Sequence, residues 1–273
     1  MQHFSTSPLE MGASFWRNRA LIIALTKREI LGRYRGSVLG LFWSFFNPIL
    51  MLTVYTFVFS VVFKARWGLS ESSSKSEYAL VLFAGMIVFN IFSECVGRAP
   101  GLILSNINYV KKVVFPLEIL PWVSLSASLF HSVISIIVWL GFYLVFFGIP
   151  SLTSFFLPLV VLPLVVFSMG LSWVLASLGV YLRDISQVIG VVITMLMFLS
   201  GIFYSVSSLP AEYQEVMRLN PLVSIIEQAR GVLIWGESPD YLYLISCMGL
   251  ALIFAWLGFA WFQKTRKGFG DVL

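Results

Sequence analysis

The chain has 273 residues, of which 59% are hydrophobic and only 11% are charged. A soluble domain of this length needs more polar surface than that to cover itself, so the composition excludes an ordinary soluble enzyme and indicates a membrane protein. The formal net charge of +5 does not indicate nucleic-acid binding, because the Lys and Arg residues stand in short clusters between apolar runs. We therefore expect the charge to reflect membrane topology.

Residues 1–37 precede the first long apolar run. Within residues 15–36, apolar residues recur at helical spacing among Arg and Lys: Leu21, Ile22, Leu25 and Ile30. This pattern predicts an amphipathic helix in the membrane interface, with its basic face toward anionic headgroups. A solvated basic lead-in to the first span is the alternative. The apolar run that follows is longer than a signal-peptide core, so we expect the N-terminus to be retained.

Six apolar segments are long enough to cross the hydrocarbon core, which takes about 20 helical residues. They cover about residues 38–63, 78–97, 119–147, 154–180, 187–205 and 241–262. The sequence therefore predicts an all-α membrane protein, with six transmembrane helices in one domain over 38–263 and a cytoplasmic tail over 264–273. Only residues 148–151 separate the third and fourth spans, so these two form an antiparallel hairpin.

Basic residues are shared unequally between the two sides of the membrane. With six spans, both termini lie on the same side as the loops 98–118 and 181–186. That side holds thirteen of the 18 Lys and Arg residues, and the other side holds five. Because cytoplasmic loops carry an excess of Lys and Arg, both termini are predicted to be cytoplasmic.

Two non-spanning stretches have a pattern of their own. In the cytoplasmic loop 98–118, apolar residues at helical spacing predict a short helix that serves as a docking surface, with a plain connector as the alternative. The external stretch 206–239 is too polar to span and too apolar for a solvated loop. Asn220-Pro221 and Gly231 interrupt it, which predicts re-entrant external helices over 207–237, before the last span.

Catalytic motifs are missing from the sequence. No segment reads G-x-x-x-x-G-K-[ST], and the two cysteines lie far apart, so the chain is predicted to be neither an ATPase nor a metalloprotein. The polar residues within the spans are Asn47, Asn90, Glu94 and His131. Because ion-coupled transporters place several carboxylates near the midplane, this scarcity argues against ion coupling. His131 is interpreted as a helix-packing donor, with a proton relay as the alternative.

Five segments resemble one family in its order and spacing. The segment LTKREILGRYRGSVLGLFWSFFNPILMLTVYTFVFSVVF, residues 25–63, resembles the start of the type-2 ABC exporter permeases that move polysaccharides and polyol phosphates. The others are YVKKVVFPLEILP (109–121), YLRDI (181–185), GIFYSVSSLP (201–210) and LNPLVSIIEQARGVLIWG (219–236). The chain is most similar to Wzm-like O-antigen permeases, with capsular polysaccharide and teichoic acid permeases close behind.

The resemblance implies a homodimer paired with two copies of a separate ATPase subunit, which holds ATP and Mg; no cofactor is implied for this chain. The family's coupling elements would fall near residues 98–112 and around Arg183-Asp184. The candidates for ATPase coupling are Asn106, Lys111, Lys112, Arg183 and Asp184. A structural salt bridge between Arg183 and Asp184 is the alternative for that pair.

The resemblance also implies export of a polyprenyl-diphosphate-linked polysaccharide of the O-antigen type across the inner membrane. Arg33 and Arg35 are candidates for its pyrophosphate, because guanidinium groups bind phosphate bidentately; positive-inside anchoring is the alternative. Aromatic residues that could line a sugar-conducting pore are Phe42, Phe45, Tyr55, Phe59, Phe198 and Tyr204. Ordinary helix packing also explains them. The remaining alternatives for function are teichoic acid or capsular export, drug or lipid export, and ion-coupled transport.

Overall fold

The computed structural model describes residues 5–62, 75–111 and 115–273. Within those ranges the chain forms helices and turns and no strand. Its α-helices are α1 (Pro8–Arg17), α2 (Arg19–Arg33), α3 (Trp43–Tyr55), α4 (Lys75–Arg98), α5 (Ile107–Val110), α6 (Leu120–Phe147), α7 (Leu157–Tyr181), α8 (Ile185–Phe198), α9 (Ala211–Arg218), α10 (Pro221–Arg230), α11 (Tyr241–Thr265) and α12 (Phe269–Val272). The prediction of an all-helical protein is confirmed for this part of the chain.

Five of the described helical segments are long and apolar enough to cross a membrane. They are Gly40–Val58, Glu77–Gly101, Leu117–Phe147, Leu152–Tyr181 and Tyr241–Val272. The fifth predicted span, 187–205, corresponds to the shorter α8, which ends at Phe198. Its 14 residues extend about 21 Å, less than the hydrocarbon thickness of about 30 Å. The turns that follow begin near Gly201, whose φ of 64° ends the helical run.

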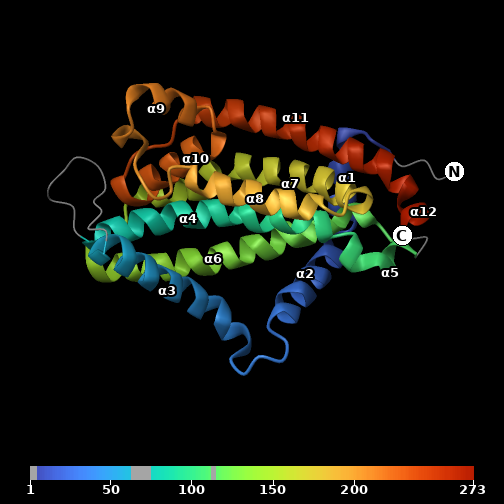
Figure 1. Ribbon diagram of the computed structural model, residues 1–273, viewed down its shortest axis with the longest axis horizontal. Coiled ribbons are helices and arrows are strands. Elements are labelled where there is room, and N and C mark those ends of the chain that lie inside the picture. Colours follow the sequence, from blue (N-terminus) through green and yellow to red (C-terminus); the bar gives the residue numbers. More distant parts are fainter. Residues whose placement is uncertain (1–4, 63–74, 112–114) are drawn as a thin grey trace.

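Helix α4 lies at the centre of the bundle, between α6, α7, α8 and α10 (Figure 1). Most of its side chains are buried, whereas α3 and α8 keep most of theirs exposed. Helices α7 and α11 pack through small residues. A Cβ added at Gly258 would lie 2.3 Å from the carbonyl oxygen of Gly170, so the two backbones touch. Close approach through glycine is typical of packing between membrane helices.

The N-terminal region folds as two helices rather than the single one predicted over 15–36. Asn18 ends α1 and precedes α2. Ile22 and Leu25 of α2 are buried against Ile119 and Val123 at the start of α6. Beyond this contact α2 runs out of the bundle and α3 runs back to it, so residues 34–42 between them project from the bundle (Figure 1). The first span therefore begins at Gly40, two residues after the predicted start.

The two ends of the bundle differ. Helices α1 and α12 lie at one end and α9 lies at the other (Figure 1), so the two terminal helices share a side as predicted. At the α9 end, α9 and α10 meet at Asn220, whose side chain accepts a hydrogen bond from the amide of Leu222 at 3.1 Å. After α10 the chain continues as a π-helical segment, η8 (Gly231–Trp235). The predicted break at Asn220-Pro221 is confirmed, but Gly231 changes the helical winding rather than ending the helix.

The loop between α4 and α6 is less regular than the predicted helix. Its described residues form the 3₁₀ turns η3 (Ala99–Gly101) and η4 (Leu104–Asn106), the single-turn α5, and a third 3₁₀ turn, η5 (Leu117–Ile119). Its apolar residues Leu102 and Ile103 are buried. η3 lies directly on α7, because a Cβ added at Gly179 would lie 2.0 Å from the carbonyl oxygen of Pro100. The loop is therefore fixed to the end of α7.

Candidate functional site

A polar cavity of about 260 Å³ lies where α2, α3, α4 and α6 meet. Its polar lining comes from all four elements: Arg33 and Tyr34 at the end of α2, Ser44 and Asn47 of α3, Asn90, Ser93 and Glu94 of α4, and His131, Ser132 and Ser135 of α6. Its apolar lining includes Met51, Tyr55 and Phe83. Polar side chains are rare inside membrane helices and tend to mark functional sites there, so this cavity is the candidate site.

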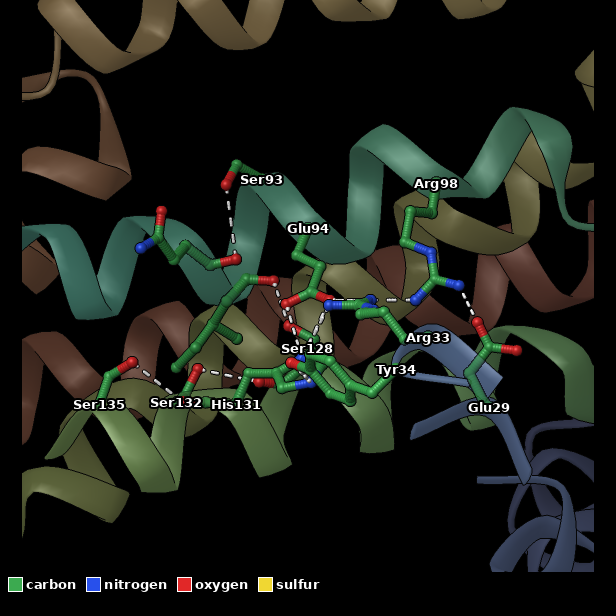
Figure 2. A network of polar contacts seen from close by, with 12 residues as sticks. Glu29, Arg33, Tyr34, Ser93, Glu94, Arg98, Ser128, His131, Ser132 and Ser135 are labelled. Atoms are coloured by element: carbon green, nitrogen blue, oxygen red, sulfur yellow. Dashed lines mark hydrogen bonds and ion pairs between the residues drawn. The ribbon is translucent and has the colours of Figure 1, made fainter. Parts of the chain in front are cut away.

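Glu94 is the centre of a charged network along one side of the cavity (Figure 2). It forms an ion pair with Arg33, and its two carboxylate oxygens lie 3.2 and 3.4 Å from Nδ1 of His131. Nη1 of Arg33 lies 3.0 Å from the same ring nitrogen. Because arginine only donates hydrogen bonds, Nδ1 either accepts from Arg33 or carries a proton that it donates to Glu94. His131 thus has two alternative partners.

The network continues back to α2. Arg98, one turn beyond Glu94, forms an ion pair with Glu29 of α2, and its Nη1 lies 3.9 Å from Glu94 (Figure 2). The two carboxylates and two guanidinium groups balance in formal charge. Tyr34 closes the other side, with its hydroxyl 3.4 Å from Nε2 of His131. Burial raises the pKa of the Tyr34 hydroxyl, so the phenol stays neutral at physiological pH.

A second arginine, Arg230 of α10, is buried at the opposite end of the bundle, with only 1% of its surface exposed. Its guanidinium donates to three backbone carbonyls: those of Val81 at 3.0 Å, Gly201 at 2.9 Å and Ile202 at 2.8 Å. Gly85 of α4 leaves room for it, because a Cβ there would lie 2.5 Å from Nη2. Arg230 therefore joins the α9–α10 region to α4 and to the turn after α8.

Comparison with known proteins identifies the family of this chain. Residues 20–234 match the model of the ABC-2 type transporter family. This chain belongs to that family. It is 27% identical to the O-antigen export system permease protein RfbA of Myxococcus xanthus, across 94% of this chain and 96% of that protein. It is 28% identical to the capsule polysaccharide export inner-membrane protein CtrC of Neisseria meningitidis serogroup B, across 93% and 96%.

A further relative is RfbA of Klebsiella pneumoniae, at 25% identity across 93% of this chain and 95% of that protein. The resemblance seen in the sequence is thus confirmed: the chain is an ABC-2 type permease, a multi-pass membrane protein of a transport-subunit family, similar to O-antigen and capsular polysaccharide export proteins over nearly its whole length.

The predicted coupling residues of this ABC-2 permease lie at the end of the bundle that carries the termini. Asn106 donates to the carbonyl of Leu102 at 2.9 Å, and Lys111 is exposed at the end of α5. Lys112 lies outside the described residues. Arg183 and Asp184 are exposed in the short turn before α8 and form no ion pair with any residue that the structure describes. The alternative of a structural salt bridge between them thus has no support in this turn.

The predicted phosphate-binding arginines differ in their surroundings. Arg33 turns toward the cavity and is paired with Glu94. Arg35, two residues later, is exposed in the segment that projects from the bundle. Arg33 can therefore meet an external phosphate only in exchange for Glu94, whereas Arg35 is accessible without any rearrangement. Whether either binds phosphate stays a prediction.

The pore candidates form two groups rather than one stripe. Phe42 and Phe45 are exposed near the start of α3. Tyr55, Phe198 and Tyr204 gather around Phe203, whose ring centroid is 6.5 Å from that of Tyr55 and 5.5 Å from that of Phe198. The Tyr204 hydroxyl donates to the carbonyl of Phe198 at 2.8 Å. The side chain of Phe59 lies outside the described part of the chain. Pore lining by these residues stays a prediction.

Sequence reasoning missed several residues that hold the structure together. Arg230 was counted only as a charge of the external loop, although its place in the apolar run ARGVLIW could have signalled burial. Glu118 is buried at the start of α6, where it accepts from Arg266 at 2.6 Å and from the Ser14 hydroxyl at 3.0 Å. These bonds join both terminal regions to α6. No local pattern signals them, because the partners are separated by 148 and 104 residues.

Proposed function

We propose that this chain is the membrane-spanning permease subunit of an ABC exporter for a polyprenyl-diphosphate-linked polysaccharide of the O-antigen type. The exporter moves its substrate from the cytoplasm across the inner membrane of a bacterium. The observation that carries this proposal is similarity to O-antigen export permeases across more than nine-tenths of both chains. Function is proposed for the chain as a whole because the similarity leaves out no large segment.

A separate ATPase subunit supplies the energy in this proposal. The sequence contains no phosphate-binding loop of its own, so nucleotide and Mg bind to the partner. Two features support a docking site at the end that carries the termini. Arg183 and Asp184 are exposed there without an ion pair to any described residue, and η3 is fixed against α7 at Gly179. A push on these elements acts on α7 directly, because backbone touches backbone there.

Two copies of the chain form the conduit in this proposal, with α3 and α8 of each copy facing the other. The exposure of these helices supports that arrangement. α8 has no buried residue along its length, and α3 buries only Ser44 and Leu52. In the homodimer, α8 and the turns after it complete the sixth crossing, and both termini lie in the cytoplasm. The α9–α10 region closes the external end at rest.

Capsular polysaccharide is a second candidate substrate, because CtrC and the polysialic acid transport protein KpsM of Escherichia coli are also similar across nearly the whole chain. KpsM is 25% identical across 88% of this chain. Teichoic acid, drug and small-lipid export belong to the same superfamily, but the relatives described above are named for O-antigen and capsule export. Membership of the ABC-2 family argues against ion-coupled transport.

The test is reconstitution of the chain with its ATPase in liposomes that contain a lipid-linked O-polysaccharide. We expect ATP-dependent appearance of the glycan on the far side, measured by its cleavage with a membrane-impermeant glycosidase. A capsular glycolipid offered in parallel separates the two candidate substrates. The proposal fails if neither glycolipid moves while a related exporter moves its own under the same conditions.

A further inference from the structure

Two asparagines inside the spans line the same cavity, and both are exposed in the single chain. Asn47 of α3 and Asn90 of α4 both line the cavity described above. Neither carboxamide has a hydrogen-bond partner among the residues that the structure describes, although the serines of the cavity bond back to their own helices, as Ser135 does to the carbonyl of His131 at 3.0 Å. Both asparagines lie within segments long and apolar enough to span the membrane.

Because both asparagines are exposed on apolar spanning segments, each carboxamide meets lipid unless a polar partner covers it. Removing an amide from water without a compensating hydrogen bond costs free energy, and lipid supplies neither donor nor acceptor. Pro48 leaves a further polar group in need of a hydrogen bond. It has no N–H to donate to the carbonyl of Ser44, a residue that also lines the cavity. The volume of about 260 Å³ greatly exceeds the roughly 10–15 Å³ that one water needs. The cavity is thus suited to a hydrated or ligand-binding role.

The chemistry of the lining indicates which ligand it suits. The charged groups at one side, Glu94 and Arg33, already neutralise each other, so the cavity has no excess charge for an ion. The two carboxamides offer both donors and acceptors, as hydroxyl groups do. Further along the same faces of α3 and α4, Met51, Tyr55 and Phe83 add an apolar lining. A sugar ring has hydroxyl groups around its edge and C–H faces, and so matches both kinds of lining.

We propose that Asn47 and Asn90 form a sugar-binding site that binds one ring of the exported glycan at a time. The glycan meets this site beside the aromatic residues of α3 and α8 as it moves through the conduit. This inference rests on the proposed export function and deepens it by assigning a site between α2, α3, α4 and α6. Binding is weak, because a conduit must release each unit. Tyr55 belongs both to this cavity and to the aromatic group around Phe203, so it links the two.

The test uses the full permease–ATPase complex in proteoliposomes with lipid-linked polysaccharide extracted from the cells that make the protein. The double variant Asn47→Leu/Asn90→Leu is expected to lower ATP-driven export at least about tenfold, because two hydrogen-bonding groups are lost. Asn90→Gln, which keeps a carboxamide, retains more export than Asn90→Leu. The matched control is Thr53→Val on α3, whose hydroxyl bonds only its own helix, at the carbonyl of Ile49, and which does not line the cavity.

A second measurement does not depend on transport. In a background of Cys95→Ala and Cys247→Ala, Asn90→Cys is labelled with a hydrophilic maleimide, and lipid-linked polysaccharide is expected to slow labelling about threefold or more. Export by the double variant at the wild-type rate, or labelling that the glycan leaves unchanged, overturns the inference. Loss of export together with dissociation of the dimer also overturns it, since the amides then serve the contact between copies. If the wild type itself exports no polysaccharide, the proposed function fails and this site falls with it.

Discussion

Arg230 and Arg33 each join a non-spanning segment to the helical bundle, at opposite ends and with different partners. Arg230 is completely buried and donates to three backbone carbonyls, which cannot move away without unwinding their turns. Arg33 is partly exposed and pairs with the Glu94 side chain, which can rotate and can exchange Arg33 for His131 or Arg98. The comparison indicates that the end with α9 and α10 is fixed by backbone contacts, whereas the network near the other end is held by exchangeable side chains.

The largest effect is expected from removing the buried Arg230 of α10. Arg230→Leu takes the arginine donors away from the carbonyls of Gly201 and Ile202, and each carbonyl left without a donor costs about 1–3 kcal/mol. The carbonyl of Val81, inside α4, loses its second hydrogen bond but keeps its helical donor. We expect the free energy of unfolding to fall by about 3 kcal/mol or more, with a lower thermal midpoint in detergent. Arg230→Lys recovers only part of the loss, because an ammonium group cannot reproduce the planar fork. An unchanged thermal midpoint for Arg230→Leu would show that the bonds of Arg230 do not hold α10 to α4 and to the turn after α8.

A smaller effect is expected from crowding the same arginine. The Cβ of Gly85→Ala would lie 2.5 Å from Nη2 of Arg230, so the guanidinium must shift, and overpacking of this kind costs about 1–3 kcal/mol. The matched control is Gly141→Ala in α6, where a Cβ would meet no described heavy atom within 4 Å and the change stabilises the helix by up to about 1 kcal/mol. Thermal unfolding of both variants measures the difference; opposite shifts are expected.

For the Arg33–Glu94 pair the expected change in stability is smaller still. In a double-mutant cycle of Arg33→Gln and Glu94→Gln, we expect a coupling free energy of about 1 kcal/mol, because the pair is partly exposed and His131 and Arg98 can replace the lost partner. The cycle is measured by thermal unfolding in detergent. A coupling as large as the loss for Arg230→Leu would remove the distinction between a fixed and an exchangeable end.

The smallest change in stability is expected at the exposed turn before α8. Arg183→Ala and Asp184→Ala remove no ion pair with a described residue, so unfolding should change by less than about 0.5 kcal/mol. ATPase activity of the assembled complex should nevertheless lose its dependence on the permease, if this turn contacts the partner. Lys267→Ala, at another basic position near the termini, is the control for charge alone. Normal ATPase coupling in both turn variants would exclude them as contacts.

Local patterns were sufficient to predict the helices but not their lengths or their neighbours. Hydrophobic runs located five long spans. Asn220-Pro221 located the break between α9 and α10, because proline restricts the backbone at its own position whatever the rest of the fold. The end of α8 at Phe198 was missed, because residues 199–205 are as apolar as a span but are shaped by Arg230 binding the carbonyls of Gly201 and Ile202.

For the candidate site, too, the sequence predicted individual residues but not how they meet. Asn47, Asn90, Glu94 and His131 stood out in the sequence as rare polar groups within apolar segments. Their meeting in one cavity, and the turn of Arg33 toward Glu94, could not be predicted, since these depend on the angles that α2 and α3 make with the bundle. The 61 residues that separate Arg33 from Glu94 contain no signal of their pairing.

Gly179 has a mechanical consequence for the whole molecule. It seats η3 on one end of α7, and at the other end the hydroxyl of Thr153, just before α7, donates to the carbonyl of Val232 in η8 at 2.8 Å. Helix α7, about 37 Å long, thus contacts the η3 loop at one end and is linked to η8 at the other end through the turn that precedes it. As one continuous helix, α7 can pass a displacement of one end to the other end. It is most flexible at Pro163, where a backbone hydrogen bond is missing.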